Sequence, residues 1–193
     1  MGTCLTCHQL ADDLATAKAR IAALEEELNT VRRTNPLTGL ANKKALAEKL
    51  TELQSHADRH NLESYLFFID LDNFKDINDN HGHKAGDDLL IAVANKLKNC
   101  LRAGDMAFHL SGDEFAVVVT GCQSTEAVRQ KIVKAIESAE VMTHHHQPII
   151  QTSCSLGVSE VVNSSPQTVI DEAEKVLQDD KAYREGQGLR HKR

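Results

Sequence analysis

The sequence has no long hydrophobic run and no leader-like N-terminus. Its apolar runs are short, as at residues 66–69 and 116–119, and a membrane-spanning helix needs roughly 20 apolar residues. The first residues do not combine a basic stretch with a following apolar core, which is the pattern of a secretory signal. These absences predict a cytoplasmic protein without a membrane segment.

The sequence also lacks an excess of positive charge and the cysteine pattern of a secreted protein. Lys and Arg total 22 against 28 Asp and Glu, which gives a formal net charge of -6. No overall field therefore attracts a nucleic-acid polymer or an anionic membrane, and a nucleotide ligand must be held by local contacts. The cysteines number five, an odd count that fits a reducing compartment better than a disulfide framework.

Near the N-terminus, apolar residues recur at alternating spacings of four and three, the seam of a left-handed coiled coil. They are Leu10, Leu14, Ala17, Ile21, Leu24, Leu28 and Val31. Opposite charges also fall where two parallel helices would face each other: Asp13 with Lys18, Arg20 with Glu25, and Glu27 with Arg32. We expect a stalk over residues 1–34 that forms a homodimer through residues 10–33. The alternative is a solitary amphipathic helix folded back on the domain. Cys4 and Cys7 lie before the apolar seam as free thiols, or as zinc ligands or interchain disulfides.

The pattern of apolar residues over 35–193 predicts one domain of mixed helices and strands. Helical spacing favours helices at about 42–59, 89–101, 124–140 and 167–183, the first capped by Asn42. Apolar runs predict strands at 65–69, 106–110, 115–120 and about 149–158. The second and third strands are joined by a short turn over residues 111–114. This order is typical of an α+β fold with adjacent antiparallel strands.

Three acidic residues stand where strands end or turn. Asp70 ends the first strand, and Asp113 and Glu114 lie in the hairpin turn. Pairing these strands would bring carboxylates together, and such a cluster is neutralised by a divalent cation, with Mg²⁺ suited to oxygen ligands and substrate phosphates. Two such ions can activate a hydroxyl and stabilise a leaving pyrophosphate, as in nucleotidyl transfer. The alternative is a set of surface acids on unrelated turns.

Several ordered motifs extend this interpretation. Residues 35–46 read NPLTGLANKKAL, residues 67–90 read FFIDLDNFKDINDNHGHKAGDDLL, and residues 102–119 read RAGDMAFHLSGDEFAVVV. Together they resemble the GGDEF family of diguanylate cyclases over about residues 35–157. The resemblance implies condensation of two GTP into cyclic di-GMP with release of two pyrophosphates. It also implies a palm-like, antiparallel-centred sheet with a ferredoxin-like core, surrounded by helices.

The resemblance implies roles for individual residues. The metal ligands would be Asp70, Asp113 and the backbone carbonyl of Leu71, and the ion would be Mg²⁺ or Mn²⁺. Glu114 matches the family acid near the 3′-hydroxyl, as a base or as a metal ligand. The guanine edge would be read by Asn78 and Asp87. The groups near the triphosphate would be Phe74, Lys75, Ser111, Gly112 and Lys181.

A second ligand site is implied by the resemblance. Arg102 and Asp105 form an RxxD pattern separated from Ser111 by five residues, the place of the family's inhibitory product site. A guanidinium and a carboxylate can address the phosphate and the guanine of cyclic di-GMP. The alternative for this pair is a local ion pair.

The sequence departs from the family pattern at four places. Ser111 replaces a glycine, which would cost about 1 kcal/mol if the position requires a positive φ. His109 replaces an arginine, a change expected to affect nucleotide or product contacts. Asn35 replaces an aspartate expected to pair with a C-terminal arginine.

The fourth departure lies in the last helix. Lys181 matches the family lysine by its place after Leu177, but Gly186 then falls too late. Aligning Gly186 instead puts Tyr183 at the lysine and Gln187 at the arginine, so one phosphate cation is missing or displaced. The alternative function is therefore a catalytically degenerate module that binds GTP or senses cyclic di-GMP.

Overall fold

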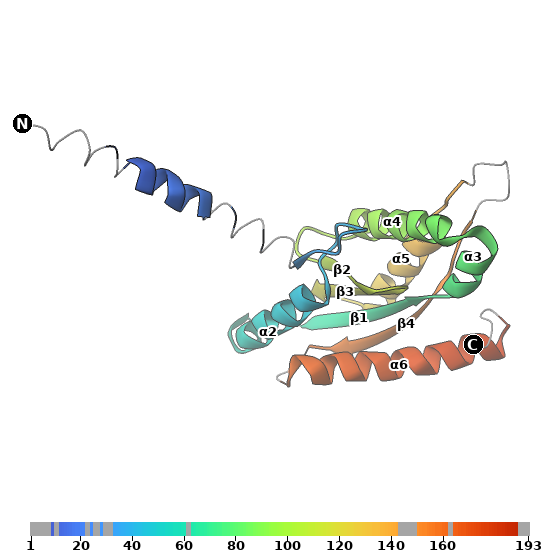
Figure 1. Cartoon of the computed structure of the whole chain (residues 1–193). Coiled ribbons are helices and arrows are strands. Elements are labelled where there is room, and N and C mark those ends of the chain that lie inside the picture. Colours follow the sequence, from blue (N-terminus) through green and yellow to red (C-terminus); the bar gives the residue numbers. More distant parts are fainter. Residues whose placement is uncertain are drawn as a thin grey trace, which may run out of the picture.

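The structure is a computed structural model that describes residues 9, 12–21, 24, 28, 33–60, 63–142, 150–161 and 164–188. In the stalk, residues 12–21 are helical and lie away from the rest of the domain (Figure 1). Four of its expected seam residues, Leu14, Ile21, Leu24 and Leu28, have between 48% and 57% of their surface exposed. Pairing of two stalks stays a prediction, and Cys4 and Cys7 lie outside the described residues.

Helices and strands are mixed along the domain in an α+β order. The elements are α2 (Lys43–His60), β1 (Ser64–Leu71), α3 (Phe74–His81), α4 (His83–Cys100), β2 (Met106–Ser111), β3 (Glu114–Thr120), α5 (Thr125–Glu137), β4 (Cys154–Glu160) and α6 (Pro166–Gly186). The four strands form one sheet in the order β2-β3-β1-β4, and every neighbouring pair is antiparallel. The predicted fold class is confirmed. In the described part of the chain, no helix has the length and hydropathy needed to cross a bilayer.

Most predicted elements lie where the sequence indicated, with two differences. Asn42 does cap α2, since its Oδ1 accepts a hydrogen bond of 3.2 Å from the Ala45 amide. The polar stretch after β1 contains a helix, α3, which hydrophobic spacing had not predicted. The last strand was predicted too early. Ile150 makes only an isolated bridge to Val141, and regular pairing with β1 begins at Cys154.

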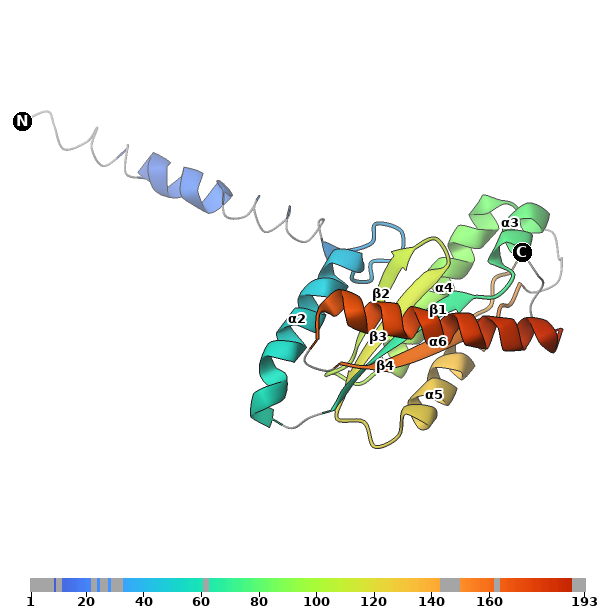
Figure 2. The ribbon, with the colours of Figure 1, turned by 90° about the horizontal axis from the view of Figure 1, so that it is seen from below.

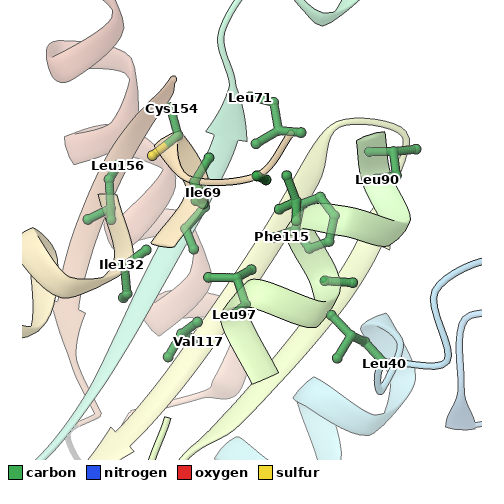
Figure 3. Close-up of a cluster of buried hydrophobic side chains, with 14 of the residues drawn as sticks. Leu40, Ile69, Leu71, Leu90, Leu97, Phe115, Val117, Ile132, Cys154 and Leu156 are labelled. Atoms are coloured by element: carbon green, nitrogen blue, oxygen red, sulfur yellow. The ribbon is translucent and has the colours of Figure 1, made fainter. Parts of the chain in front are cut away.

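Two apolar clusters lie on opposite faces of the sheet because side chains alternate along each strand. On β1, Phe67 and Ile69 face α4 and α5, in the cluster that Figure 3 shows around Phe115. Leu66 and Phe68 face α2 and α6. Figures 1 and 2 show α4 over one face of the sheet and α6 across the other. The central strand is thus buried on both sides up to its polar end.

Helix α6 packs directly on the backbone of β4. At Gly157, an added Cβ would overlap the carbonyl oxygen of Ala173 and the amide nitrogen of Leu177. A clasp lies beside this contact. Asp180 accepts from the Leu156 amide at 2.8 Å and from Arg129 at 2.7 Å, while Arg129 also donates to the Leu156 carbonyl at 3.2 Å. We call these contacts the β4 clasp, and they fix the C-terminal part of α6 over the polar end of β1.

We predict that Gly157→Ala destabilises the domain, because the new methyl group must push α6 away from β4. Overpacking of this kind costs about 1–3 kcal/mol, or more where backbone atoms obstruct. The free energy of unfolding in urea measures the effect. Gly104→Ala is the matched control, since its added Cβ would meet only Thr120 Oγ1 at 3.8 Å. Equal stability of the two variants would contradict the packing described.

Candidate active site

The acidic residues predicted from the sequence meet at one end of the two central strands. Asp70 of β1 lies directly opposite Glu114 of β3 in the antiparallel register. The Leu71 amide donates to the carbonyl oxygen of Asp113 at 3.1 Å, which continues the pairing into the turn. The structure therefore brings Asp70, Asp113 and Glu114 together, with Leu71 beside them.

Asp70 is buried and carries a cationic partner from α6. Only 2% of its surface is exposed, and its Oδ2 lies 2.8 Å from the Nζ of Lys181. The sequence alignment left Lys181 without a definite place. Because Lys181 follows Leu177 by one helical turn, it lies on the same face of α6 and reaches past the apolar cluster to the carboxylate. Lys181, which was expected to bind a substrate phosphate, therefore pairs with Asp70, which was expected to bind the metal ion.

Asp72 is a second buried carboxylate, and sequence reasoning missed it. It is 2% exposed and accepts from Ser153 Oγ at 2.7 Å and from Ser155 Oγ at 2.8 Å. Arg184 approaches its Oδ2 with Nε at 3.0 Å and Nη2 at 2.9 Å. The available signal was spacing, because Asp72 follows Asp70 by two residues and, in an extended chain, such residues face the same side. Two cationic side chains of α6, Lys181 and Arg184, therefore pair with Asp70 and Asp72.

The hairpin turn accommodates Ser111 without the strain that a positive φ would cause. The positive φ, 48°, falls at Gly112, and Ser111 is the last residue of β2. The Ser111 hydroxyl donates to Glu114 Oε2 at 2.7 Å. The expected cost of replacing the family glycine therefore does not arise at this position. The substitution instead gives Glu114 a hydrogen-bond donor that orients its carboxylate.

The cluster offers hard oxygen ligands, but not a ready cage of side chains. Among the described residues, no three His, Cys, Asp or Glu side chains converge in an arrangement that would hold a metal ion. Two carboxylates, Asp70 and Asp113, and the carbonyl of Leu71 fit Mg²⁺ or Mn²⁺ when substrate phosphates complete the coordination. An ion at this place would compete with the Lys181 ammonium for Asp70.

Four of the predicted nucleotide residues, Phe74, Lys75, Asn78 and Asp87, lie on α3 or at its junction with α4. Asn73, with φ 57°, turns the chain sharply from β1 into this helix. Phe74 is buried and Lys75 is exposed. Asn78 packs against Gly86 of α4, where an added Cβ would overlap Asn78 Oδ1. Because Asp87 follows Gly86 and is exposed, Asn78 and Asp87 lie at the same junction of α3 and α4.

Arg102 and Asp105 border a separate cavity. Asp105 Oδ2 accepts from the backbone amide of Arg102 at 3.2 Å, so the contact between them caps a turn, and the Arg102 side chain is exposed. The cavity measures about 400 Å³ and is also lined by Gly121, Ser124 and Lys131. Lys131 was missed from the sequence, because its place on α5 relative to the RxxD pattern depends on the tertiary fold.

Two of the four departures have structural roles that the sequence did not predict. Asn35 Oδ1 accepts from the amides of Leu37 and Thr38 at 2.9 and 3.2 Å, so it stabilises its own turn. His109 is 2% exposed and stacks on Phe115. The effect of His109 on nucleotide or product contacts stays a prediction, and the ring itself is buried. Burial also lowers the pKa of His109 from its usual 6.5.

Comparison with known proteins identifies relatives over most of the chain. A family model described as "Diguanylate cyclase, GGDEF domain" matches residues 33–187. The chain is 31% identical over 178 residues to diguanylate cyclase DgcS of Shewanella oneidensis, covering 91% of this chain and 58% of that protein. It is 37% identical over 126 residues to DgcN of Escherichia coli, covering 65% and 31%. The chain thus spans only part of the length of these curated relatives.

Solved structures share the fold. The coiled coil and GGDEF domain of DgcB from Caulobacter crescentus, in complex with c-di-GMP, superposes with a TM-score of 0.74 at 26% identity. That match covers 94% of this chain and 96% of the other. A sensory box/GGDEF family protein from the same species has a TM-score of 0.70 at 29% identity, covering 78% and 99%.

We predict that Lys181→Met destabilises the protein strongly, because Asp70 then stays buried without its cation. Breaking one side of a buried ion pair costs about 3–5 kcal/mol. The double variant Asp70→Asn/Lys181→Met should lose at least about 1 kcal/mol less than the sum of the two single variants. Urea unfolding of all four proteins measures the coupling. Lys175→Met, at an exposed position of α6, is the control and should change stability by less than about 0.5 kcal/mol. Additive effects would refute the coupling.

Proposed function

Because the chain belongs to the GGDEF domain family of diguanylate cyclases, we propose that it condenses two molecules of GTP into cyclic di-GMP and two pyrophosphates. The observation that carries this proposal is the junction of β1 and β3. There Asp70 lies opposite Glu114, and the Asp113 carbonyl is bonded to the Leu71 amide. This junction supplies carboxylates at the end of the two central strands, beside the start of α3.

The groups around α3 support the binding of one GTP. An amide and a carboxylate, Asn78 and Asp87, can together satisfy the donors and the acceptor on the guanine edge. The first amides of a helix have no partner within the helix, so the start of α3 favours an anion. Lys75, the second residue of α3, adds a local positive charge for the triphosphate.

In the proposed reaction, the 3′-hydroxyl of each GTP attacks the α-phosphorus of the other. An O–P bond forms, the bond between the α- and β-phosphates breaks, and pyrophosphate leaves. Glu114 accepts the hydroxyl proton or helps to hold the ion, and Ser111 Oγ orients its carboxylate through the 2.7 Å hydrogen bond. Bound Mg²⁺ or Mn²⁺ would make the hydroxyl more acidic and stabilise charge on the phosphates. Lys181, no longer needed at Asp70, could then pair with a phosphate oxygen.

Each half-site holds one GTP, so the two-fold symmetric product requires two protomers face to face. The described seam residues Leu14, Ile21, Leu24 and Leu28 are about half exposed, which supports burial of this stripe against a second copy. The parallel charge pattern along the same helix supports the orientation needed. Because GTP is an intracellular nucleotide, the activity implies a cytoplasmic location for this domain.

We expect cyclic di-GMP from the wild-type protein incubated with GTP and Mg²⁺ after bound product has been stripped. Asp113→Ala and Glu114→Ala should each give less than about 1% of that rate, since losing a group that stabilises the transition state costs about 10²- to 10³-fold. Glu174→Ala, an exposed acid on α6, is the control and should retain full activity. Mass-resolved chromatography identifies the product.

The same assay tests the dimer, because the rate per protomer should fall when the enzyme is diluted below its dimerisation constant. A rate per protomer that stays constant in a protein shown to be monomeric by light scattering would contradict the dimer. A confirmed dimer that binds GTP but yields no cyclic di-GMP would favour the alternative, a nucleotide-binding module. The contact of Lys181 with Asp70 favours that alternative, since it occupies a proposed metal ligand.

We also propose that the cavity bordered by Arg102 and Asp105 binds the product and lowers the rate. Its lining joins a guanidinium, a carboxylate and the ammonium of Lys131, groups suited to phosphate and guanine. Arg102→Ala should raise the concentration of cyclic di-GMP that halves the rate by about tenfold or more, the loss of about 1.4 kcal/mol of binding. Lys96→Ala, exposed on α4, should leave it unchanged. Identical inhibition of both variants would place product binding elsewhere.

A further inference from the structure

His109 is a buried polar residue that the proposed reaction does not use. Its ring lies flat against Phe115, the partner residue on β3, with ring centroids 4.4 Å apart and an angle of 8° between the planes. Only 2% of the residue is exposed. Burying a polar ring without hydrogen bonds would be costly, so the partners of its two nitrogens show what the residue does.

One ring nitrogen holds the hairpin turn. Nε2 lies 2.8 Å from the carbonyl oxygen of Gly112. A carbonyl oxygen only accepts, so Nε2 carries the proton. The peptide that contains this oxygen joins Gly112 directly to Asp113. Gly112 has a φ of 48°, a conformation that glycine adopts freely. Without an external partner, the backbone at this glycine could reorient easily and take the Asp113 and Glu114 side chains with it.

The other ring nitrogen holds the segment of residues 34–42, here called the connecting segment. In the neutral ring Nδ1 is an acceptor, and it lies 3.1 Å from the hydroxyl of Thr38, which donates. The His109 amide also donates to the Ala41 carbonyl at 2.8 Å. The burial that lowers the pKa of His109 keeps the ring neutral, as this pair of hydrogen bonds requires.

The connecting segment in turn contacts Arg33, the residue that directly precedes it. Its Asn42 amide donates to the Arg33 carbonyl at 2.8 Å, and Thr34 bridges Ala41. Ala41 also bridges Phe108 of β2. A continuous set of backbone and side-chain contacts therefore runs from Arg33 through the connecting segment to His109, and from His109 to the turn before Asp113.

We propose that His109 is a positioning residue whose imidazole fixes the Gly112–Asp113 peptide, and thereby aims the Asp113 and Glu114 carboxylates, while anchoring that turn to the connecting segment at Thr38. The inference rests on the proposed function where it concerns synthesis of cyclic di-GMP. It stands apart from that function where it concerns the affinity of the turn for a divalent ion. A ring that only fills space would be replaced by phenylalanine without effect on either.

The test compares variants that remove the contacts one at a time. His109→Phe keeps the stack on Phe115 and removes both ring hydrogen bonds. Thr38→Val removes only the hydroxyl that donates to Nδ1. His109→Gln offers an amide that can donate to the Gly112 carbonyl again. Val118→Ala is the matched control, because Val118 is 1% exposed on β3 but faces the opposite side of the sheet from His109.

Two readouts separate positioning from packing. The first is binding of Mn²⁺ to protein with a non-hydrolysable GTP analogue, followed by the loss of the free-ion electron paramagnetic resonance signal. The second is kcat and KM for GTP, normalised to the folded fraction. His109→Phe should weaken Mn²⁺ binding by about 10- to 100-fold, the usual effect of losing a residue that orients a ligand. It should lower kcat by a similar factor, with KM changed less than about threefold.

The remaining variants should differ in their affinity for Mn²⁺. Thr38→Val should weaken Mn²⁺ binding less than His109→Phe, and His109→Gln should recover part of the loss. Val118→Ala should lower the melting temperature but leave Mn²⁺ affinity and kcat unchanged. If His109→Phe fails to fold, Thr38→Val and His109→Gln decide the question by themselves.

The outcomes distinguish this inference from the proposed function. Mn²⁺ affinity and kcat in His109→Phe equal to those of Val118→Ala would overturn the positioning role. If the wild-type protein makes no cyclic di-GMP but His109→Phe still weakens Mn²⁺ binding, the positioning role stands and the proposed cyclase activity is refuted.

Discussion

The two carboxylates at the end of β1, Asp70 and Asp72, are both 2% exposed, and the C-terminal part of the domain is arranged to neutralise them. Lys181 and Arg184 come from one helix and lie three residues apart, so a single placement of α6 satisfies both charges. Gly157 and the β4 clasp fix that placement. The buried acids at this end of the sheet therefore depend on α6 being packed directly against the backbone of β4. In the proposed reaction, a divalent ion would take the place of the Lys181 ammonium at Asp70.

The sequence predicted the fold well because hydrophobic spacing reports which residues are buried. Local patterns predicted strand β1 with Asp70 near its end, the hairpin around residues 111–114 and the Asn42 cap. Helix α3 could not be found in this way, since its polar sequence is stabilised by a turn at Asn73 and by packing against α4. The start of β4 was misplaced because Thr152 and Ser153 contact Asp72 instead of continuing the pairing with β1.

The candidate site was predicted only in part, and its missing members share one physical cause. Asp113 and Glu114 were visible because they are adjacent in a motif, and Asp70 because it ends an apolar run. Contacts such as Asp72 with Arg184, 112 residues apart, depend on how α6 crosses the sheet. Sequence spacing does not encode that crossing. The burial of His109 was not visible for the same reason, since the side of the hairpin that its ring occupies follows from the pairing with Phe115.

The β4 clasp has a further consequence for how copies of this protein can meet. An edge strand with unpaired amides and carbonyls is a template for strands of other chains. At β4, Asp180 and Arg129 occupy both backbone groups of Leu156, and at β2 the bridge from Ala41 to Phe108 covers part of the opposite edge. The addition of strands from other chains, a first step toward fibrils, is obstructed at these points on both edge strands. Association of copies, as in the proposed dimer, is thereby left to contacts outside these strand edges.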